Sequence, residues 1–249
     1  MSDCPLFAGT SGFAYTSWKP DFYPEKLPSS QFLNYYGSRL NAVEVNYTYR
    51  RIAAAGTFEK WLAATPDRFT FLPKAHMKIT HSLKLKDAED FTRYFLQSLE
   101  PLRAAGRLGP ILFQLAPNFA ADPALLNDFV RLLPRSGKAA FEFRNASWFT
   151  DEIYKILGDH NAALCMAENE NLETPPVVTA DFVYLRLRKP DYSESELLNI
   201  DRRIQQYLSN SYPTYAIFKH EDTPAGALNA EKLLLMHKSA AKISVADLA

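Results

Sequence analysis

One unit recurs throughout this sequence: a short apolar strand that ends in charged or polar residues and leads into a helix. It is clearest in residues 141–148. Phe141 and Phe143 point to one face of a strand, and Glu142 and Arg144 point to the other. Opposite charges on one face of an aromatic strand are costly to bury unless they pair or meet a ligand. The stretch therefore predicts a strand whose polar face lines a pocket.

Eight such strands are predicted, and most are followed by a helical pattern. The strands span residues 6–12, 42–47, 69–76, 109–115, 141–144, 162–168, 182–188 and 214–220. The helices span residues 31–40, 57–64, 87–105, 122–133, 193–208 and 223–238, with another that runs to residue 157 from a cap at Ser147 or Thr150. Thr57 is a candidate cap, Asp122 precedes a proline at the first helical position, and Ser193 and Glu196 have capping-box spacing.

The sixth unit departs from this pattern. Residues 169–180 contain Pro175 and Pro176, which leave no room for a regular helix before the seventh strand. We therefore expect a degenerate sixth helix and a gap that widens access to the carboxyl ends of the strands. The tail at residues 239–249 is predicted to fray.

Eight strand–helix units in 249 residues predict an α/β fold, the (β/α)8 TIM barrel. Composition shows no break, so residues 1–249 are expected to form a single domain with its core at about residues 5–238. An open doubly wound sheet is the alternative. It would favour a glycine-rich phosphate fingerprint after the first strand, and Gly9-Thr10-Ser11-Gly12 lacks the required spacing.

Charge and cysteine content narrow the functional classes. The 28 basic and 28 acidic residues cancel, so bulk charge favours neither nucleic acid nor an anionic membrane. Cys4 and Cys165 have no metal-binding spacing, and no apolar stretch reaches membrane-spanning length. We expect a cytoplasmic protein with no metal or other cofactor and no membrane partner, and its oligomeric state stays open.

Inward-pointing side chains near the carboxyl ends of the strands line the functional mouth of a TIM barrel. Strand alternation gives this set as Glu44, Asn46, Lys74, His76, Gln114, Glu142, Arg144, Glu168, Arg186, Arg188 and either Lys219 or His220. Cations outnumber anions in it: Lys74, Arg144, Arg186, Arg188 and Lys219 against Glu44, Glu142 and Glu168. Since the planar arginine fork suits phosphate or carboxylate, the surplus predicts a small anionic ligand.

The expected function is that of an enzyme, such as a hydrolase or lyase, that acts on a small phosphorylated or carboxylated compound. The expected catalytic residues are Glu44, Glu142 and Lys74, with one glutamate as the acid–base group that the lysine tunes. The expected substrate-binding residues are Tyr15, Trp18, Asn46, His76, Gln114, Arg144, Trp148, Arg186, Arg188 and Lys219. The arginines would hold the anion, and the aromatic residues would either stack on a sugar or base or anchor their loops to the barrel rim.

Other interpretations of the same residues stay open. The plainest is a buried ion-pair network that plugs the barrel, made of Glu44, Glu142, Arg144 and Arg186. His76 and His81 with three glutamates would form a metal site, although the neighbouring cations repel a divalent ion. Glu44 and Glu142 would also suit a glycosidase pair, but the cation excess disfavours neutral glycans.

Two further alternatives belong to other classes of function. The basic mouth with its aromatic residues could bind or repair nucleic acid, which the neutral total charge does not favour. The protein could also be a non-catalytic ligand sensor. A steep loss of binding with salt would support nucleic acid, and thermal stabilisation without turnover would support a sensor.

Five segments form a specific combination. They are Gly9-Thr10-Ser11-Gly12 with Tyr15, Trp18 and Phe22-Tyr23-Pro24; residues 43–50; residues 71–74 with Ile79-Thr80-His81; residues 112–115 with Pro117 and Phe119; and residues 141–144 with Ser147-Trp148. Together they resemble the DUF72 (YecE-like) family of barrel proteins over nearly the whole chain. The resemblance implies a TIM barrel and brings no established activity with it.

Two segments depart from the pattern of that family. Arg186-Leu187-Arg188-Lys189 stands where the family usually has Arg-Leu-His-Gly after the seventh strand. His220-Glu221-Asp222 stands where an asparagine-rich turn usually follows the eighth. Both changes fall at the mouth, so the ligand of typical members need not be the ligand here.

Overall fold

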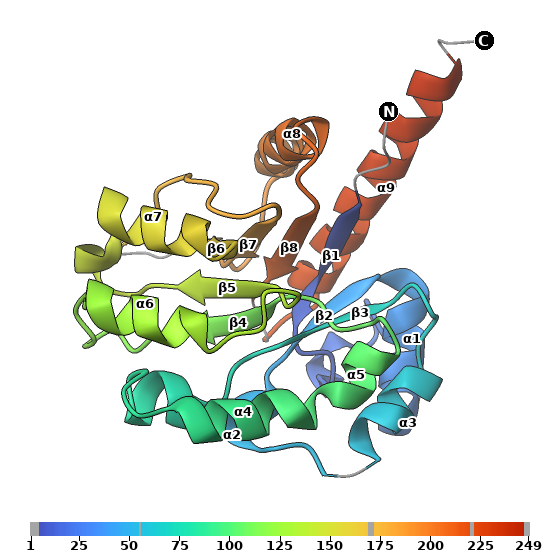
Figure 1. The fold of residues 1–249 in the computed structure, drawn as a ribbon. Coiled ribbons are helices and arrows are strands. Elements are labelled where there is room, and N and C mark those ends of the chain that lie inside the picture. Colours follow the sequence, from blue (N-terminus) through green and yellow to red (C-terminus); the bar gives the residue numbers. More distant parts are fainter. Residues whose placement is uncertain (1–4, 55, 169–171, 220–221, 247–249) are drawn as a thin grey trace.

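The computed structural model describes residues 5–54, 56–168, 172–219 and 222–246 (Figure 1). Within these ranges, eight parallel strands form one sheet in the order β3-β2-β1-β8-β7-β6-β5-β4. The strands are β1 Leu6–Ser11, β2 Ala42–Val45, β3 Thr70–Pro73, β4 Ile111–Gln114, β5 Ala139–Glu142, β6 Ala162–Ala167, β7 Val183–Leu187 and β8 Thr214–Phe218. Bridges from Phe71 to Leu108 and from Lys74 to Leu112 join β3 to β4 and complete the barrel. The predicted TIM barrel is confirmed.

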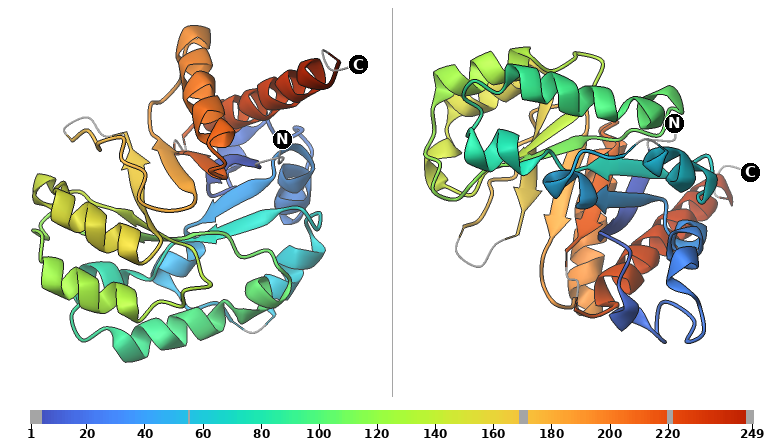
Figure 2. Two further views of the ribbon diagram at one scale, coloured as in Figure 1. Left: turned by 45° about the horizontal axis from the view of Figure 1, so that its top comes forward. Right: turned by 90° about the horizontal axis from the view of Figure 1, so that it is seen from below.

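Helices surround this barrel (Figure 2). They are α1 Phe32–Arg39, α2 Tyr47–Arg50, α3 Thr57–Ala63, α4 Glu89–Ser98, α5 Glu100–Ala104, α6 Pro123–Arg131, α7 Asp151–Asp159, α8 Glu194–Ser209 and α9 Ala225–Ala246. Local sequence sets where several of them begin. Asp122 and Thr150 accept hydrogen bonds from the first turns of α6 and α7, and Ser193 and Glu196 form the predicted capping box of α8.

Three predicted helix boundaries are wrong. Gly56, with a left-handed φ of 80°, is the cap of α3, so Thr57 is its first helical residue. The predicted helix at residues 87–105 is divided at Leu99, because Pro101 cannot donate within a continuous helix. The last helix runs to Ala246 through the predicted frayed tail, since alanine and lysine there are strong helix formers.

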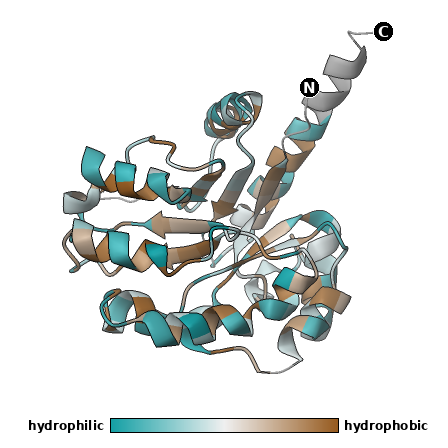
Figure 3. Cartoon of the chain, in the orientation of Figure 1, coloured by the Kyte–Doolittle hydropathy of each residue, from teal (hydrophilic) through white to brown (hydrophobic). Residues whose placement is uncertain are grey.

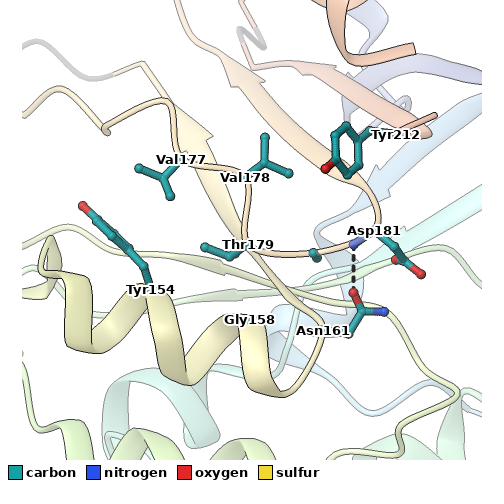
Figure 4. A pocket seen from close by; sticks show the side chains of 9 residues that line it. Tyr154, Gly158, Asn161, Val177, Val178, Thr179, Asp181 and Tyr212 are labelled. Atoms are coloured by element: carbon teal, nitrogen blue, oxygen red, sulfur yellow. Dashed lines mark hydrogen bonds between the residues drawn. The ribbon is translucent and has the colours of Figure 1, made fainter. Parts of the chain in front are cut away.

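The sixth unit is degenerate as predicted, in that residues 172–180 contain no helix. A pocket of about 460 Å³ lies beside this connection, between Tyr154, Asn161, Asp181 and Tyr212 (Figure 4). Asn161 and Asp181 lie just before β6 and β7, at the amino ends of the strands. This pocket therefore lies at the end of the barrel opposite the mouth.

Two apolar clusters hold the fold together. The larger one packs the helices against the outside of the sheet, and hydrophilic and hydrophobic stretches alternate along the helices (Figure 3). The smaller one fills the barrel with Ala42, Leu72, Leu112, Ala140, Ala163, Cys165, Ala167, Phe182, Tyr184, Tyr215 and Ile217. Small side chains on β5 and β6 leave room there for the rings of Tyr184 and Tyr215. None of the helices in the described ranges is both long and apolar enough to cross a bilayer.

A polar layer lies directly above the smaller cluster, which we call the inner cluster, because side chains alternate along a strand. Residues two positions after an inner-cluster residue point into the same interior space. They are Glu44 after Ala42, Lys74 after Leu72, Gln114 after Leu112, Glu142 after Ala140 and Arg186 after Tyr184. The barrel thus carries its ionisable side chains at the carboxyl-end mouth.

Candidate functional site

A buried triad made of Glu44, Glu142 and Arg186 occupies the centre of the mouth. The three side chains are 0% exposed. Arg186 donates from Nη2 to Glu44 Oε1 at 2.6 Å and from Nη1 to Glu142 Oε2 at 2.5 Å. One guanidinium on β7 therefore bridges carboxylates from β2 and β5, two strands that are not neighbours in the sheet.

Two further hydrogen bonds are donated to the carboxylate of Glu44. Ser11 Oγ donates to its Oε1 at 2.7 Å, and the Tyr184 hydroxyl donates to its Oε2 at 2.9 Å. Asn46 Nδ2 donates to Ser11 Oγ at 3.0 Å, so this predicted binding residue supports Ser11 rather than facing the triad directly. Sequence reasoning missed Ser11 and Tyr184. Tyr184 shares the inward face of its strand with Arg186, a signal that could have identified it.

Glu142 is equally well satisfied. Gln114 Nε2 lies 2.9 Å from each carboxylate oxygen, and Arg188 Nη2 donates to Oε1 at 2.5 Å. The backbone N–H of Arg188 also donates to Glu168 Oε2 at 2.8 Å, an oxygen that accepts a second hydrogen bond from the Tyr192 hydroxyl. Gln114 and Arg188 are thus placed at the mouth as predicted, in contact with Glu142.

Electrostatics keep both triad carboxylates ionised. Burial alone would raise the pKa of Glu142, but Arg186 and Arg188 lower it to about 2. Burial likewise opposes ionisation of Glu44, and Arg186 and the Ser11 hydrogen bond nevertheless lower its pKa. A carboxylate with a lowered pKa is a poor general acid at neutral pH. Glu44, Glu142 and Arg186 therefore form a buried ion-pair network in the structure, as in the plainest interpretation of the sequence.

The surroundings of Lys74, which lies directly after β3, disfavour its charged form, whereas those of the two glutamates favour theirs. Lys74 is 8% exposed, and its Nζ has no hydrogen bond or ion pair with any residue that the structure describes. The ammonium lies 4.2 Å from the centre of the Tyr49 ring. Burial, and then the charge of Arg186, lower the pKa of Lys74 to about 8 against the opposing effect of the two triad glutamates.

Removal of this ammonium is expected to stabilise the protein. Because the folded-state pKa is about 8 and the ordinary value is 10.5, the buried charge destabilises the fold below pH 8. That penalty disappears as the pH rises from 8 to 10.5. Lys74→Met should raise the free energy of unfolding at pH 7 by about 2 kcal/mol, with a smaller gain at pH 10, as measured by urea denaturation.

Lys78→Met is the matched control for this prediction. Lys78 is exposed, although its Nζ also lies over an aromatic ring, 4.5 Å from the centre of Phe91. Its replacement should change stability by less than about 0.5 kcal/mol. A loss of stability in Lys74→Met at pH 7 would show that the buried ammonium holds the fold together.

Three further basic residues follow the strands at the same end of the barrel as Lys74: His81, Arg144 and Lys219. Arg144 follows β5, Lys219 follows β8, and both are partly buried without a carboxylate partner in the described part of the chain. The charge of Lys219 acts on Lys74. Burial, and then the charges of Lys74 and Arg144, lower the pKa of His81, whose ring lies 5.5 Å from that of Tyr49. Because its pKa is lowered, His81 is mostly neutral at pH 7, and we call Lys74, Arg144 and Lys219 the cationic cluster.

Three predicted binding residues pack against other side chains. His76 packs its ring 5.0 Å from Phe91 of α4, because strand alternation stops when β3 ends at Pro73. Trp18 and Trp148 are 0% exposed, so neither has a face available for stacking on a ligand. The assignments of Trp18 and Trp148 are corrected, and that of His76 stays a prediction. His220, the alternative to Lys219, lies outside the described residues.

Both tryptophans anchor loops. Trp148 stacks 4.7 Å from Phe143 and donates from Nε1 to the Phe119 carbonyl at 2.7 Å. Trp18 packs against Tyr15 at 4.9 Å. Tyr15 itself is partly exposed, and its hydroxyl donates to the Ser11 carbonyl, which places it at the rim of the mouth.

Among the residues that the structure describes, no group of three His, Cys, Asp or Glu side chains lies close enough to hold a metal ion. His81 instead contacts Thr80 Oγ1 at 2.9 Å, and Glu168 is bound by the Arg188 backbone.

Comparisons with known proteins agree on the fold. A family described as "Protein of unknown function DUF72" matches residues 7–247. A DUF72 family protein from Thermotoga maritima has a TM-score of 0.82 at 28% identity, covering 94% of this chain and 99% of its own. One from Enterococcus faecalis has a TM-score of 0.76 at 19% identity, covering 92% and 95%.

Two curated relatives match over shorter stretches. The UPF0759 protein YunF of Bacillus subtilis is 30% identical over 56% of this chain and 52% of its own length. The UPF0759 protein YecE of Escherichia coli is 30% identical over 47% of this chain and 43% of its own length. The chain therefore spans about half the length of the curated relatives that it matches.

Proposed function

Because the chain belongs to the DUF72 family, whose description assigns no activity, we propose from the site itself that it is an enzyme acting on a small anionic compound. The ligand would lie at the carboxyl-end mouth and carry a phosphate or carboxylate group. The cationic cluster would bind that group, and Lys74 would be the reacting side chain. The triad would stay ionised beneath it.

One observation carries this proposal: within the described part of the chain, no member of the cationic cluster forms an ion pair with a carboxylate. Arg186 forms ion pairs with both Glu44 and Glu142, and Arg188 forms one with Glu142. Lys74, Arg144 and Lys219 form no ion pair with any described carboxylate. Like charges held together in a partly buried site destabilise one another, and an anion that binds between them relieves that repulsion.

The same geometry supports roles that differ from the sequence-based expectation. Arg186 is fully buried and already paired with two carboxylates. Arg144 and Lys219 are therefore better candidates than Arg186 for binding the anion. Lys74, with a pKa of about 8, is able to accept a proton near neutral pH, whereas Glu142 is held ionised. This supports acid–base or nucleophilic chemistry at Lys74.

A glycosidase mechanism is less well supported. It requires one of two carboxyl groups to be protonated so that it donates a proton to the leaving oxygen. Here both candidate carboxylates bind the same guanidinium, and both have lowered pKa values.

Anion binding can be measured by titrating inorganic phosphate into the protein in a calorimeter. Arg144→Gln and Lys219→Met should each weaken binding by about 10- to 100-fold, as expected for a lost charge-assisted hydrogen bond. Arg93→Gln is the control, because Arg93 is an exposed α4 arginine paired with Glu89. Equal phosphate affinity in all three variants, each folded by circular dichroism, would contradict the proposal.

A further inference from the structure

Starting from the proposed function, we propose that Lys74 is an amine nucleophile. The substrate class is then a small anionic aldehyde or ketone, with which Lys74 forms a Schiff base. The phosphate or carboxylate of that compound would be held by Arg144 and Lys219. The carbonyl group would then lie at the ε-amine. Such a protein would act on carbonyl compounds rather than on esters or glycosides.

The position of the amine is the first support. Lys74 is the only buried lysine among the residues whose side chains the structure describes. It points into the mouth, where the charges of Glu44, Glu142 and Lys219 act on it. Buried lysines ordinarily have a hydrogen-bonding partner. A buried amine that has no ion pair or hydrogen bond with any described residue and lies beside other cations is instead an arrangement that activates lysine for attack on carbonyl groups.

The backbone around Lys74 is held on several sides. Its N–H donates to the Val45 carbonyl at 3.2 Å, and its carbonyl accepts from Thr48 Oγ1 at 2.8 Å. The next residue, Ala75, donates its N–H to the Leu112 carbonyl of β4 at 2.8 Å. The start of the side chain is therefore fixed between β2 and β4, which is the support that a positioned nucleophile needs.

The protonation state provides a second support. With a pKa of about 8, a substantial fraction of Lys74 is neutral at physiological pH, whereas an ordinary lysine is almost wholly protonated. The neutral amine is the form that attacks. The Tyr49 ring and the neighbouring cations thus surround an amine whose reactive form is well populated.

The reaction is balanced without any oxidant or reductant. The Nζ lone pair attacks the carbonyl carbon, the carbon–oxygen π electrons move to oxygen, and a proton passes from nitrogen to oxygen to give a carbinolamine. Protonation of that hydroxyl by solvent and loss of water leave a protonated C=N bond to Lys74. The positive iminium then withdraws electrons from the adjacent carbon. Glu44 and Glu142, both ionised, stabilise this cation electrostatically.

Reductive trapping tests the proposal on the full-length protein. Glyoxylate and glyceraldehyde 3-phosphate serve as probes, one with a carboxylate and one with a phosphate, in the presence of sodium cyanoborohydride. Peptide mass mapping should find the reduced adduct on Lys74, with an occupancy at least about 10-fold above that on the exposed Lys78. The initial rate should rise with pH and reach half of its maximum near pH 8.

Variants make the result specific. Lys74→Met and Lys74→Arg should lose the adduct, and Lys78→Met should keep it. Adducts spread over exposed lysines without preference for Lys74 would overturn the proposal. Phosphate binding by the same wild-type sample, without an adduct at Lys74, would overturn the Schiff base and leave the proposed function standing. Absence of both phosphate binding and adduct would overturn the two together.

Discussion

Arg186→Met is expected to destabilise the protein by about 3 to 5 kcal/mol, as measured by urea denaturation at pH 7. The substitution removes the guanidinium that bridges Glu44 and Glu142, both fully buried. Two carboxylates would then remain in the barrel with much of their charge uncompensated. Methionine fills a similar volume, so the loss reflects charge rather than an empty cavity.

Two controls separate this effect from packing. Arg39→Met removes an arginine that also binds one glutamate, Glu231, through two nitrogens, but that pair is partly exposed and the loss should be smaller. The triple variant Glu44→Gln, Glu142→Gln and Arg186→Met removes all three charges and should recover most of the stability. A loss below about 1 kcal/mol in Arg186→Met would show that the carboxylates are hydrated or protonated instead.

Acid should weaken the fold through the same triad. The pKa of Glu142 is lowered from 4.5 to about 2, so its ionisation contributes stability above pH 4.5 that is lost as the pH falls toward 2. The full contribution is about 3 kcal/mol, of which about 2 kcal/mol should be lost between pH 6 and pH 3. Urea denaturation at these two pH values measures it.

The comparison that isolates this effect is Glu142→Gln against Glu196→Gln. The pKa of Glu196 is also lowered to about 2, by Lys189 and the Ser193 cap, but its side chain is exposed. Glu142→Gln should flatten the loss of stability between pH 6 and pH 3 by about 2 kcal/mol. Glu196→Gln should flatten it less because solvent screens its ion pair. Identical pH profiles for wild type and Glu142→Gln would contradict the assignment.

The sequence by itself determined the barrel and the residues that face its mouth. Period-two alternation along each strand places Glu44, Lys74, Gln114, Glu142 and Arg186 on the inward face, and alternation is a local property of extended backbone. Helix starts at Asp122, Thr150 and Ser193 are equally local, because a cap needs only the next few residues.

Only the tertiary structure decided what those residues do for one another. Trp18 and Trp148 follow the ends of strands, where no periodicity predicts direction, and packing buries both completely. Arg186 could have faced a ligand. The closure of the barrel instead brings β2 and β5 close to it, so its guanidinium donates to Glu44 and Glu142. The same closure leaves Lys74 buried over the Tyr49 ring, without an ion pair to any residue that the structure describes, since pairing depends on distances between strands far apart in sequence.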